Sequence, residues 1–343
     1  MIVAFLAACG KGDDKAGGDA ASPVALRLQA GIEVTGPATG KVVDKTVTTT
    51  VDDRTGDVME VTMTVEERDW EPYMTSIGTS RATAAAWEPG DAIGIYMVEA
   101  GSVAVTGGAE NRLYTTAAGD GAFTADEANT IYFPQDGTAV DFLAYYPRVA
   151  VSADGTFTLD VTDQSDLSSL DLLTARASST GTAPLDKDHP AVALAFSHRM
   201  TSLELAIEAG TGLATADLVG LRVEITGQRV AGNYDPVAGL LGVDATPVET
   251  VALAVTPDGR AARGILLPTT GTTGMNPVIA GRELLFTLPT GEVLRWSIPD
   301  DKSFNRGEKN LYTIRVNRTG LDVTSTIVDW TPGNGDGETG EAE

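Results

Sequence analysis

The chain has 343 residues, of which 42% are hydrophobic, and a formal net charge of −24 with a pI near 4.3. This composition predicts about two domains with packed cores. It argues against nucleic acid as a partner, because such binding rests on Lys and Arg neutralising phosphates. Only two histidines and one cysteine are present, which excludes an internal disulfide and almost excludes multi-histidine metal sites.

The first nine residues have the pattern of an export signal. A short apolar run, Ile2–Leu6, precedes the small residues Ala7 and Ala8 and the single cysteine, Cys9. The stretch Leu6-Ala7-Ala8-Cys9 resembles the lipobox of bacterial lipoproteins, in which the cysteine receives lipid and becomes the mature N-terminus. We therefore expect lipidation at Cys9 and attachment to the outer membrane through that lipid.

Two features depart from that pattern. The apolar run is short, and no Lys or Arg lies between Met1 and its start. A start codon assigned too far downstream would explain both. The alternative is an ordinary hydrophobic N-terminus with an incidental cysteine.

Residues 10–23 are small, charged and rich in glycine, which predicts a flexible tether. Beyond Val24 the apolar residues alternate. Residues 47–51 and 59–65 keep a period of two on either side of the turn-like sequence at 52–57, which predicts a β-hairpin. Further alternating runs lie at 203–207, 221–225, 251–255, 284–288, 294–298 and 312–316. Helical periodicity is scarce, and its best candidate is the stretch at 163–177.

The polar sequence at 180–190, TGTAPLDKDHP, is the strongest candidate for a domain boundary. We expect an N-terminal β domain at 24–187, a C-terminal β domain at 188–331, and a disordered acidic tail at 332–343. The fold class is all-β with antiparallel sheets, because the parallel βαβ alternative needs helical crossovers that the sequence does not offer.

No arrangement of residues predicts catalysis. The G-x-G-x-x-G match at 335–340 lies in the acidic tail, and the sequence at 36–41 is one residue short of a phosphate-binding loop. His198 precedes a strand pattern and is interpreted as a structural histidine. We therefore expect a non-enzymatic protein with no catalytic residue, no metal site and no cofactor.

Seven segments, taken together and in order, resemble the fimbrillin-like proteins of Bacteroidales. The first contains Trp87-Glu-Pro-Gly-Asp-Ala-Ile-Gly-Ile-Tyr96, which is similar to the W-x-x-G-D-x-I-G-[IV] segment of that family. The resemblance covers about residues 24–331. The other segments are Asn111–Tyr114, Ile131–Pro134, Val140–Pro147, Asp171–Ala175, Leu194–His198 and Val328–Trp330.

The resemblance implies two transthyretin-like or Ig-like antiparallel β-sandwich domains in a surface lipoprotein that serves as a subunit of type V pili. The partners would be other fimbrillin subunits, as a homo- or hetero-polymer. In this family an Arg-specific protease removes the lipidated N-terminal strand, and a strand from a neighbouring subunit then enters the exposed groove. Strand addition of this kind gives an unpaired edge a full set of backbone hydrogen bonds.

The resemblance points to cleavage between Arg81 and Ala82, directly before the Trp87 segment. The surrounding sequence, GTSRATAAA, is small and polar and suits an exposed loop. Arg54, in the predicted hairpin turn, is the competing site, while Arg27 and Arg68 lie closer to strand patterns. The alternative is that Arg81 is an ordinary loop residue.

A second interpretation keeps the fold without polymerisation. Beyond Trp330 the chain is hydrophilic and rich in glycine, which makes a poor donor strand. A donor would have to come from 321–328, a segment that could equally belong to its own sheet. The rival is a non-polymerising surface lipoprotein or a pilus tip that binds a host glycan or protein. An exported hydrolase is the least favoured reading.

Overall fold

The computed structural model describes residues 23–32, 47–52, 58–63, 87–269, 279–317 and 320–329. Within these ranges the chain is built almost entirely of β-strands, with one short α-helix, α2 (Leu167–Leu170), and one short 3-10 helix, η1 (Thr215–Leu218). The predicted all-β fold with antiparallel sheets is therefore confirmed. The helix predicted at 163–177 shrinks to the four residues of α2, because 173–177 instead pair with β7 as a strand.

Seven strands close into a barrel in the order β1-β10-β9-β7-β4-β5-β6. Its interior is a cluster of buried apolar side chains that includes four aromatic rings contributed by Trp87, Phe123, Phe142 and Phe196. A closed barrel leaves no sheet edge exposed, provided that every strand is in place. The strands are β1 (Arg27–Ile32), β4 (Ala92–Glu99), β5 (Arg112–Thr116), β6 (Ala122–Thr124), β7 (Val140–Tyr146), β9 (Leu173–Ala177) and β10 (Ala191–His198).

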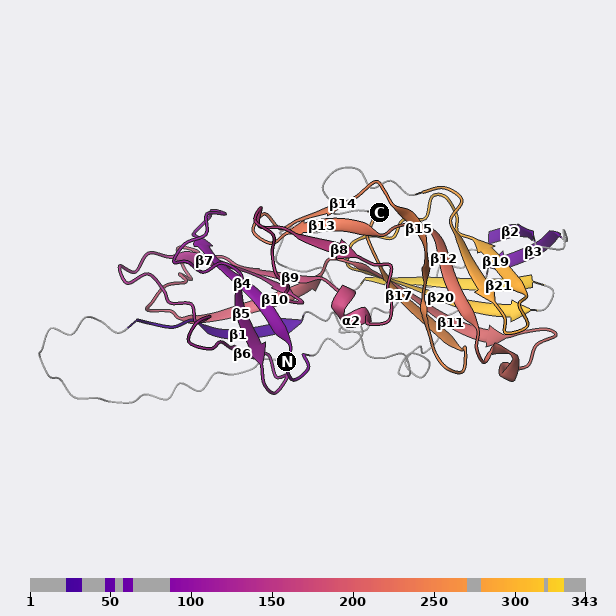
Figure 1. The fold of residues 1–343 in the computed structure, drawn as a ribbon, viewed down its shortest axis with the longest axis horizontal. Coiled ribbons are helices and arrows are strands. Elements are labelled where there is room, and N and C mark those ends of the chain that lie inside the picture. Colours follow the sequence, from indigo (N-terminus) through magenta and orange to yellow (C-terminus); the bar gives the residue numbers. More distant parts are fainter. Residues whose placement is uncertain are drawn as a thin grey trace, which may run out of the picture.

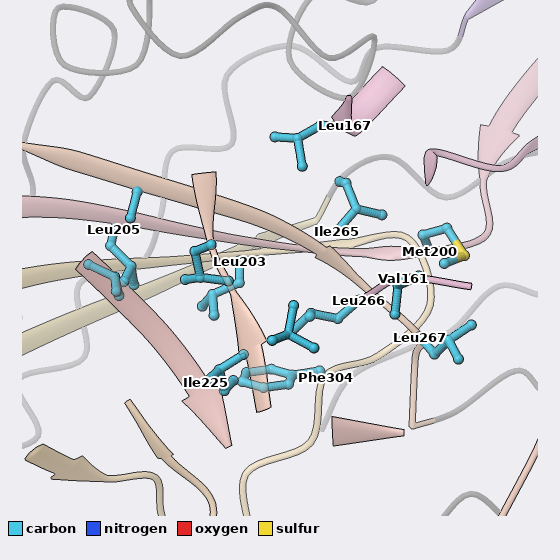
Figure 2. Packing of buried hydrophobic residues seen from close by; sticks show 14 of the residues in the cluster. Val161, Leu167, Met200, Leu203, Leu205, Ile225, Ile265, Leu266, Leu267 and Phe304 are labelled. Atoms are coloured by element: carbon cyan, nitrogen blue, oxygen red, sulfur yellow. The ribbon is translucent and has the colours of Figure 1, made fainter. Parts of the chain in front are cut away.

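The C-terminal half forms two sheets with a shared apolar core (Figure 1). The seven-stranded sheet has the order β16-β17-β11-β20-β21-β3-β2, and the four-stranded sheet has the order β15-β12-β18-β19. Figure 2 shows part of this core, which includes Leu203 and Leu205 of β11, Ile225 of β12 and Phe304. The strands are β11 (Thr201–Ala209), β12 (Arg222–Arg229), β15 (Val248–Ala252), β16 (Ala254–Val255), β17 (Ala261–Leu266), β18 (Glu283–Thr287), β19 (Val293–Ser297), β20 (Glu308–Asn317) and β21 (Gly320–Asp329).

A three-stranded sheet connects the barrel to the sandwich. It consists of β14 (Leu240–Val243), β13 (Ala231–Asp235) and β8 (Phe157–Asp160). Phe157 of β8 stacks on Tyr145 of β7 with ring centroids 5.1 Å apart, and Tyr234 of β13 lies 5.5 Å from Phe157. Because Tyr145 belongs to the outer face of the barrel, these rings join the barrel wall to the C-terminal core.

The strand β1 lies in the barrel, whereas the next two strands, β2 and β3, lie at the opposite end of the molecule (Figure 1). β1 closes the barrel, whereas β2 (Val47–Asp52) and β3 (Val58–Met63) pair with each other and add to the edge of the seven-stranded sheet beside β21. The predicted hairpin is thereby confirmed as a pair of antiparallel strands. Its position beside the C-terminal strand was not predictable from the local pattern.

Three pairs of strands are parallel, which the sequence did not lead us to expect. β1 pairs with β10, β11 pairs with β20, and β3 pairs with β21 at a single position. Parallel neighbours need a long connection, and here the connection is supplied by other strands of the fold instead of by a helix. The sequence argument considered only helical crossovers and so overlooked this solution.

The polar segment at 180–190 connects β9 to β10 within the barrel. β10, which the predicted boundary at 187/188 assigned to the C-terminal domain, pairs with β1 along six residues. Polar sequences rich in proline and glycine mark surface loops, whether or not a domain ends there. The last strand of the barrel ends at His198, but β2, β3 and β8, which come earlier in the chain, belong to other sheets. The division into two domains stays a prediction.

Candidate strand-exchange site

β1 is the strand that closes the barrel, between β10 and β6. It pairs in parallel with β10 from Arg27 to Ile32 and with β6 at two positions only, Leu28 and Gln29. Without β1, β6 and β10 would each present an unpaired edge to the same gap. The barrel is therefore closed by a short strand that lies near the beginning of the described chain.

The side chains of β1 alternate between the core and solvent. Leu28, Ala30 and Ile32 are buried in the barrel, whereas Arg27 and Gln29 are exposed. This alternation is what a strand with one face on an apolar core requires. Each buried Leu or Ile contributes about 1.5–3 kcal/mol of apolar burial, so the side chains add to the backbone hydrogen bonds that hold β1 in the barrel.

Trp87 covers β1 from inside the barrel. Its indole N–H donates a 3.0 Å hydrogen bond to the carbonyl oxygen of Ala30. The ring meets Phe123, Tyr146 and Phe196 edge to face, with centroids 5.0, 5.6 and 5.1 Å away. A buried indole N–H needs an acceptor, and β1 supplies it, so the position of this tryptophan depends on a strand 57 residues earlier in the chain.

The turn after Trp87 sets the start of β4. Gly90 has a φ of +93°, and the carboxylate of Asp91 accepts a hydrogen bond from the backbone N–H of Glu88. β4 then begins at Ala92 and directs Ile93 into the core. This segment is therefore a turn that leads into a strand, and its glycine adopts the left-handed conformation that few other residues tolerate.

A second glycine lets β6 and β1 come close together. The carbonyl oxygen of Gly121 accepts a 2.8 Å hydrogen bond from the N–H of Ala30. Gly121 has a φ of +82°, and a Cβ atom at this position would lie 2.2 Å from the oxygen of Ala30. Only glycine therefore combines this backbone conformation with this contact.

The segment before β1 is held by residues 131–133. The N–H of Leu26 donates to the oxygen of Ile131 at 2.9 Å, and the N–H of Phe133 donates to the oxygen of Val24 at 3.0 Å. The Tyr114 hydroxyl accepts from the N–H of Ile131 at 3.0 Å. Burial raises the pKa of this hydroxyl, so the tyrosine stays neutral at physiological pH.

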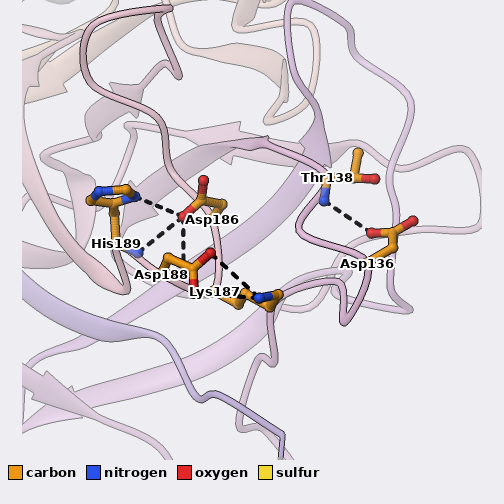
Figure 3. A network of polar contacts seen from close by, with 6 residues as sticks. All are labelled: Asp136, Thr138, Asp186, Lys187, Asp188 and His189. Atoms are coloured by element: carbon orange, nitrogen blue, oxygen red, sulfur yellow. Dashed lines mark hydrogen bonds and ion pairs between the residues drawn. The ribbon is translucent and has the colours of Figure 1, made fainter. Parts of the chain in front are cut away.

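The loop before β10 fixes the other neighbour of β1. In Figure 3 the carboxylate of Asp186 faces the ring of His189, with 2.8 Å between Oδ1 and Nδ1, and the same oxygen accepts the N–H groups of Asp188 and His189. The hydrogen bond from His189 holds the pKa of Asp186 below its ordinary value. This turn ends at Pro190, whose oxygen accepts the N–H of Arg27, and so sets the register between β10 and β1.

Polar side chains buried elsewhere in the barrel have structural roles. His198 is buried, and its Nδ1 lies 2.9 Å from Oδ1 of Asp171, as a structural histidine would. Asp141 on β7 receives the guanidinium of Arg176 at 2.9 Å and the N–H groups of Gly101 and Ser179. Burial opposes ionisation of Asp141, but these donors hold its pKa below the ordinary value.

The residues predicted to be modified cannot be placed. Cys9, Arg54, Arg81 and Ala82 all lie outside the described residues. Among the residues that are described, no group of three or more His, Cys, Asp or Glu side chains is arranged to hold a metal ion. None of the described helices has the length and apolar character needed to cross a membrane.

Sequence reasoning did not identify β1 as the strand that closes the barrel, although it singled out four of the segments that surround it. Trp87, Tyr114, Ile131 and Phe196 come from four of the segments that resemble the fimbrillin-like family, and all four contact β1 or its barrel core. The ordered spacing was the available signal. It could show that the segments belong together but not that they surround one strand.

Comparisons with known proteins agree with this architecture. The family model described as fimbrillin-like matches residues 80–330. The chain is 43% identical over 275 residues to the candidate fimbrium subunit Fim1C of Bacteroides uniformis, covering 77% of this chain and 85% of that protein.

Solved structures extend the comparison to three dimensions. The crystal structure of a candidate cell adhesion protein from Bacteroides uniformis superposes with a TM-score of 0.62 at 39% identity, covering 71% of this chain and 93% of that one. A candidate cell adhesion protein from Bacteroides ovatus shares the fold, with a TM-score of 0.58 at 18% identity over 91% of this chain and 100% of that one. The chain belongs to the fimbrillin-like family, as a structural and non-enzymatic protein of the cell surface.

Proposed function

We propose that this protein is a structural subunit of a cell-surface fimbria, in which a strand from a neighbouring subunit replaces β1. The observation that carries the proposal is the position of β1, which alone separates the edges of β6 and β10. An incoming strand with alternating apolar residues would regain the backbone ladder to β10 and fill the pockets of Leu28, Ala30 and Ile32.

Cleavage after Arg81 would be the trigger for exchange. Loss of the residues up to Arg81 removes β1, β2 and β3 together, because all three precede the cleavage site. The exposed apolar groove would cost roughly 25 cal/mol per Å², which makes rapid capture of a partner strand necessary. One cut would thus open the barrel and also uncover the side of β21 that β3 occupies.

N-terminal sequencing of surface-assembled fibres tests this step. We expect a chain that begins at Ala82. Arg81→Ala should leave full-length monomer, whereas Arg54→Ala, a matched loss of arginine at the competing site, should still assemble. Fibres whose chains begin at Cys9 would contradict cleavage after Arg81 as the trigger of strand exchange.

Export as a lipoprotein would place the uncleaved subunit at the outer membrane through Cys9. The observation that supports lipidation is the lipobox-like sequence that ends at this cysteine. Metabolic labelling with a palmitate analogue should mark the wild type and not Cys9→Ser, which should be released into the medium. Equal labelling of both proteins would contradict lipidation.

One observation favours a second role, as a non-polymerising surface lipoprotein or a pilus tip that binds a host glycan or protein. β21 (Gly320–Asp329) pairs with β20 at ten consecutive positions, so the candidate donor segment at 321–328 is engaged in its own sheet. A subunit that keeps β21 in place would offer no strand to the next subunit. Immunogold electron microscopy separates the two roles: label along fibres supports the stalk subunit, and label at fibre ends or dispersed on the surface supports the alternative.

A further inference from the structure

A pocket of about 330 Å³ lies beside the aromatic junction between barrel and sandwich. Its floor is the outer face of β7 and β9, with Leu143 and Thr174. Its opposite wall is Tyr234 and the turn at 236–239 between β13 and β14. The volume is at the lower end of the roughly 300–1,000 Å³ typical of pockets for small ligands. Leu143, Thr174 and Tyr234 are all buried, so the pocket rests on rigid elements.

Three arginines line this pocket: Arg176 from β9, Arg199 from the connection between β10 and β11, and Arg306 from the loop before β20. Two of them are fixed by contacts on the barrel. Arg199 donates through Nε to the Thr174 hydroxyl. Arg176 donates through Nε to Ser178 at 2.9 Å and through Nη2 to Asp141 at 2.9 Å.

Arg176 keeps capacity for another partner. A guanidinium has five N–H donors, of which Ser178 and Asp141 occupy two, and its side chain is 35% exposed. The planar group is therefore held in position by two bonds while its side chain stays partly open to solvent. Such pre-organisation favours recognition of a planar anionic group.

The charge of the pocket is opposite to that of the protein. The chain has a formal net charge of −24, with 48 acidic and 24 basic residues. Among the described residues that line the pocket, three are arginines and none is an aspartate or glutamate. A cluster of cationic donors in an acidic protein concentrates anions at one place that the rest of the surface repels.

We propose that this arginine pocket binds a small organic anion of the class of carboxylated or sulfated sugar units. Guanidinium groups pair with carboxylate and sulfate oxygens through parallel hydrogen bonds. The apolar surface of Leu143, Pro236 and Val237 would accept the face of a sugar ring. This inference deepens the ligand-binding role named above and does not depend on strand exchange.

Isothermal titration of the purified full chain tests the proposal, with glucuronate and galactose 6-sulfate as ligands and with glucose and inorganic phosphate as controls. We expect at least one of the two anionic sugars to bind about tenfold more tightly than either control. Because the contact is ionic, the affinity should fall several-fold between low and high salt. The assignment would be overturned if neither glucuronate nor galactose 6-sulfate bound more tightly than both glucose and inorganic phosphate.

Two variants locate the binding. Arg306→Gln should weaken it about tenfold, whereas Arg222→Gln removes the same charge from a side chain that is 71% exposed and distant in the fold, and should leave it unchanged. Ala238→Glu places a carboxylate on the exposed rim without altering any arginine, and should abolish binding. Circular dichroism confirms that each variant is folded. Unchanged affinity in both folded pocket variants would overturn the proposal.

Discussion

β1 and β21 are both strands that lie between two neighbours, yet they are held in different ways. β1 spans six residues, pairs in parallel with β10 and touches β6 at two positions. β21 spans ten residues and pairs in antiparallel fashion with β20 at every one of them, but meets β3 at a single position. β1 thus combines a six-residue ladder with three buried side chains, whereas β21 has a ladder of ten residues to β20.

We expect this difference to separate a strand that can be replaced from one that stays in place. A short strand with three buried side chains can be exchanged for another strand with the same length and alternation. A strand that contributes ten paired residues to the sandwich cannot leave without unzipping the whole ladder. We expect β1 to be the exchangeable element and β21 to stay in its own sheet unless its environment changes.

The largest effect on stability should come from a charge placed on the buried face of β1. Leu28→Asp would bury a carboxylate in the barrel core and should lower the free energy of unfolding by about 4 kcal/mol. Arg27→Asp introduces the same group at the exposed neighbouring position and should cost less than about 0.5 kcal/mol. Urea denaturation measures both. Similar costs for the two variants would show that side-chain burial does not hold β1.

A proline scan along 321–328 should reveal the ladder of β21. Proline cannot donate a backbone hydrogen bond, so alternate positions whose N–H groups face β20 should each cost about 2 kcal/mol, and the positions between them should cost less. The readout is the urea midpoint of each variant. A flat profile would contradict continuous pairing and would favour β21 as a donor strand.

The hydrogen bond from Trp87 should affect β1 selectively. Trp87→Phe keeps an aromatic ring but loses the bond to Ala30, and should reduce stability by about 1 kcal/mol. It should also speed amide hydrogen exchange in 26–32. Trp296→Phe makes the same change in the sandwich core and should leave β1 exchange unaltered at matched stability. Equal acceleration in both variants would argue against a local role for Trp87.

Acid should loosen the barrel by a smaller amount. The pKa of Asp141 is held below its ordinary value, so its contribution to stability is present above the unfolded pKa near 3.9 and is lost as pH falls through the folded value. We expect the free energy of unfolding to fall as the pH drops below 4. Asp141→Asn should be less stable at neutral pH and should lack this part of the acid dependence, as thermal melts between pH 2 and 7 would show. Parallel pH curves for the variant and the wild type would refute this role.

Local patterns in the sequence determined the strands. Alternating apolar residues predicted the hairpin of β2 and β3 and many C-terminal strands, because one face of each strand must meet a core. Turn residues such as Gly90 marked where β4 begins, since only certain residues adopt the required backbone conformation. The ordered segments from Trp87 onward were enough to identify the family, which the comparisons confirm.

Tertiary structure alone decided which strands are neighbours. Nothing in the local pattern places Ala30 beside Trp87 and Gly121, sends β2 and β3 to the far sheet, or keeps β10 in the barrel with β1. Periodicity states which face of a strand is buried but not against which partner, because many pairings bury the same apolar face equally well. Closing the barrel requires β1 to supply backbone partners to β6 and β10 at once, and that condition exists only when the whole chain has folded.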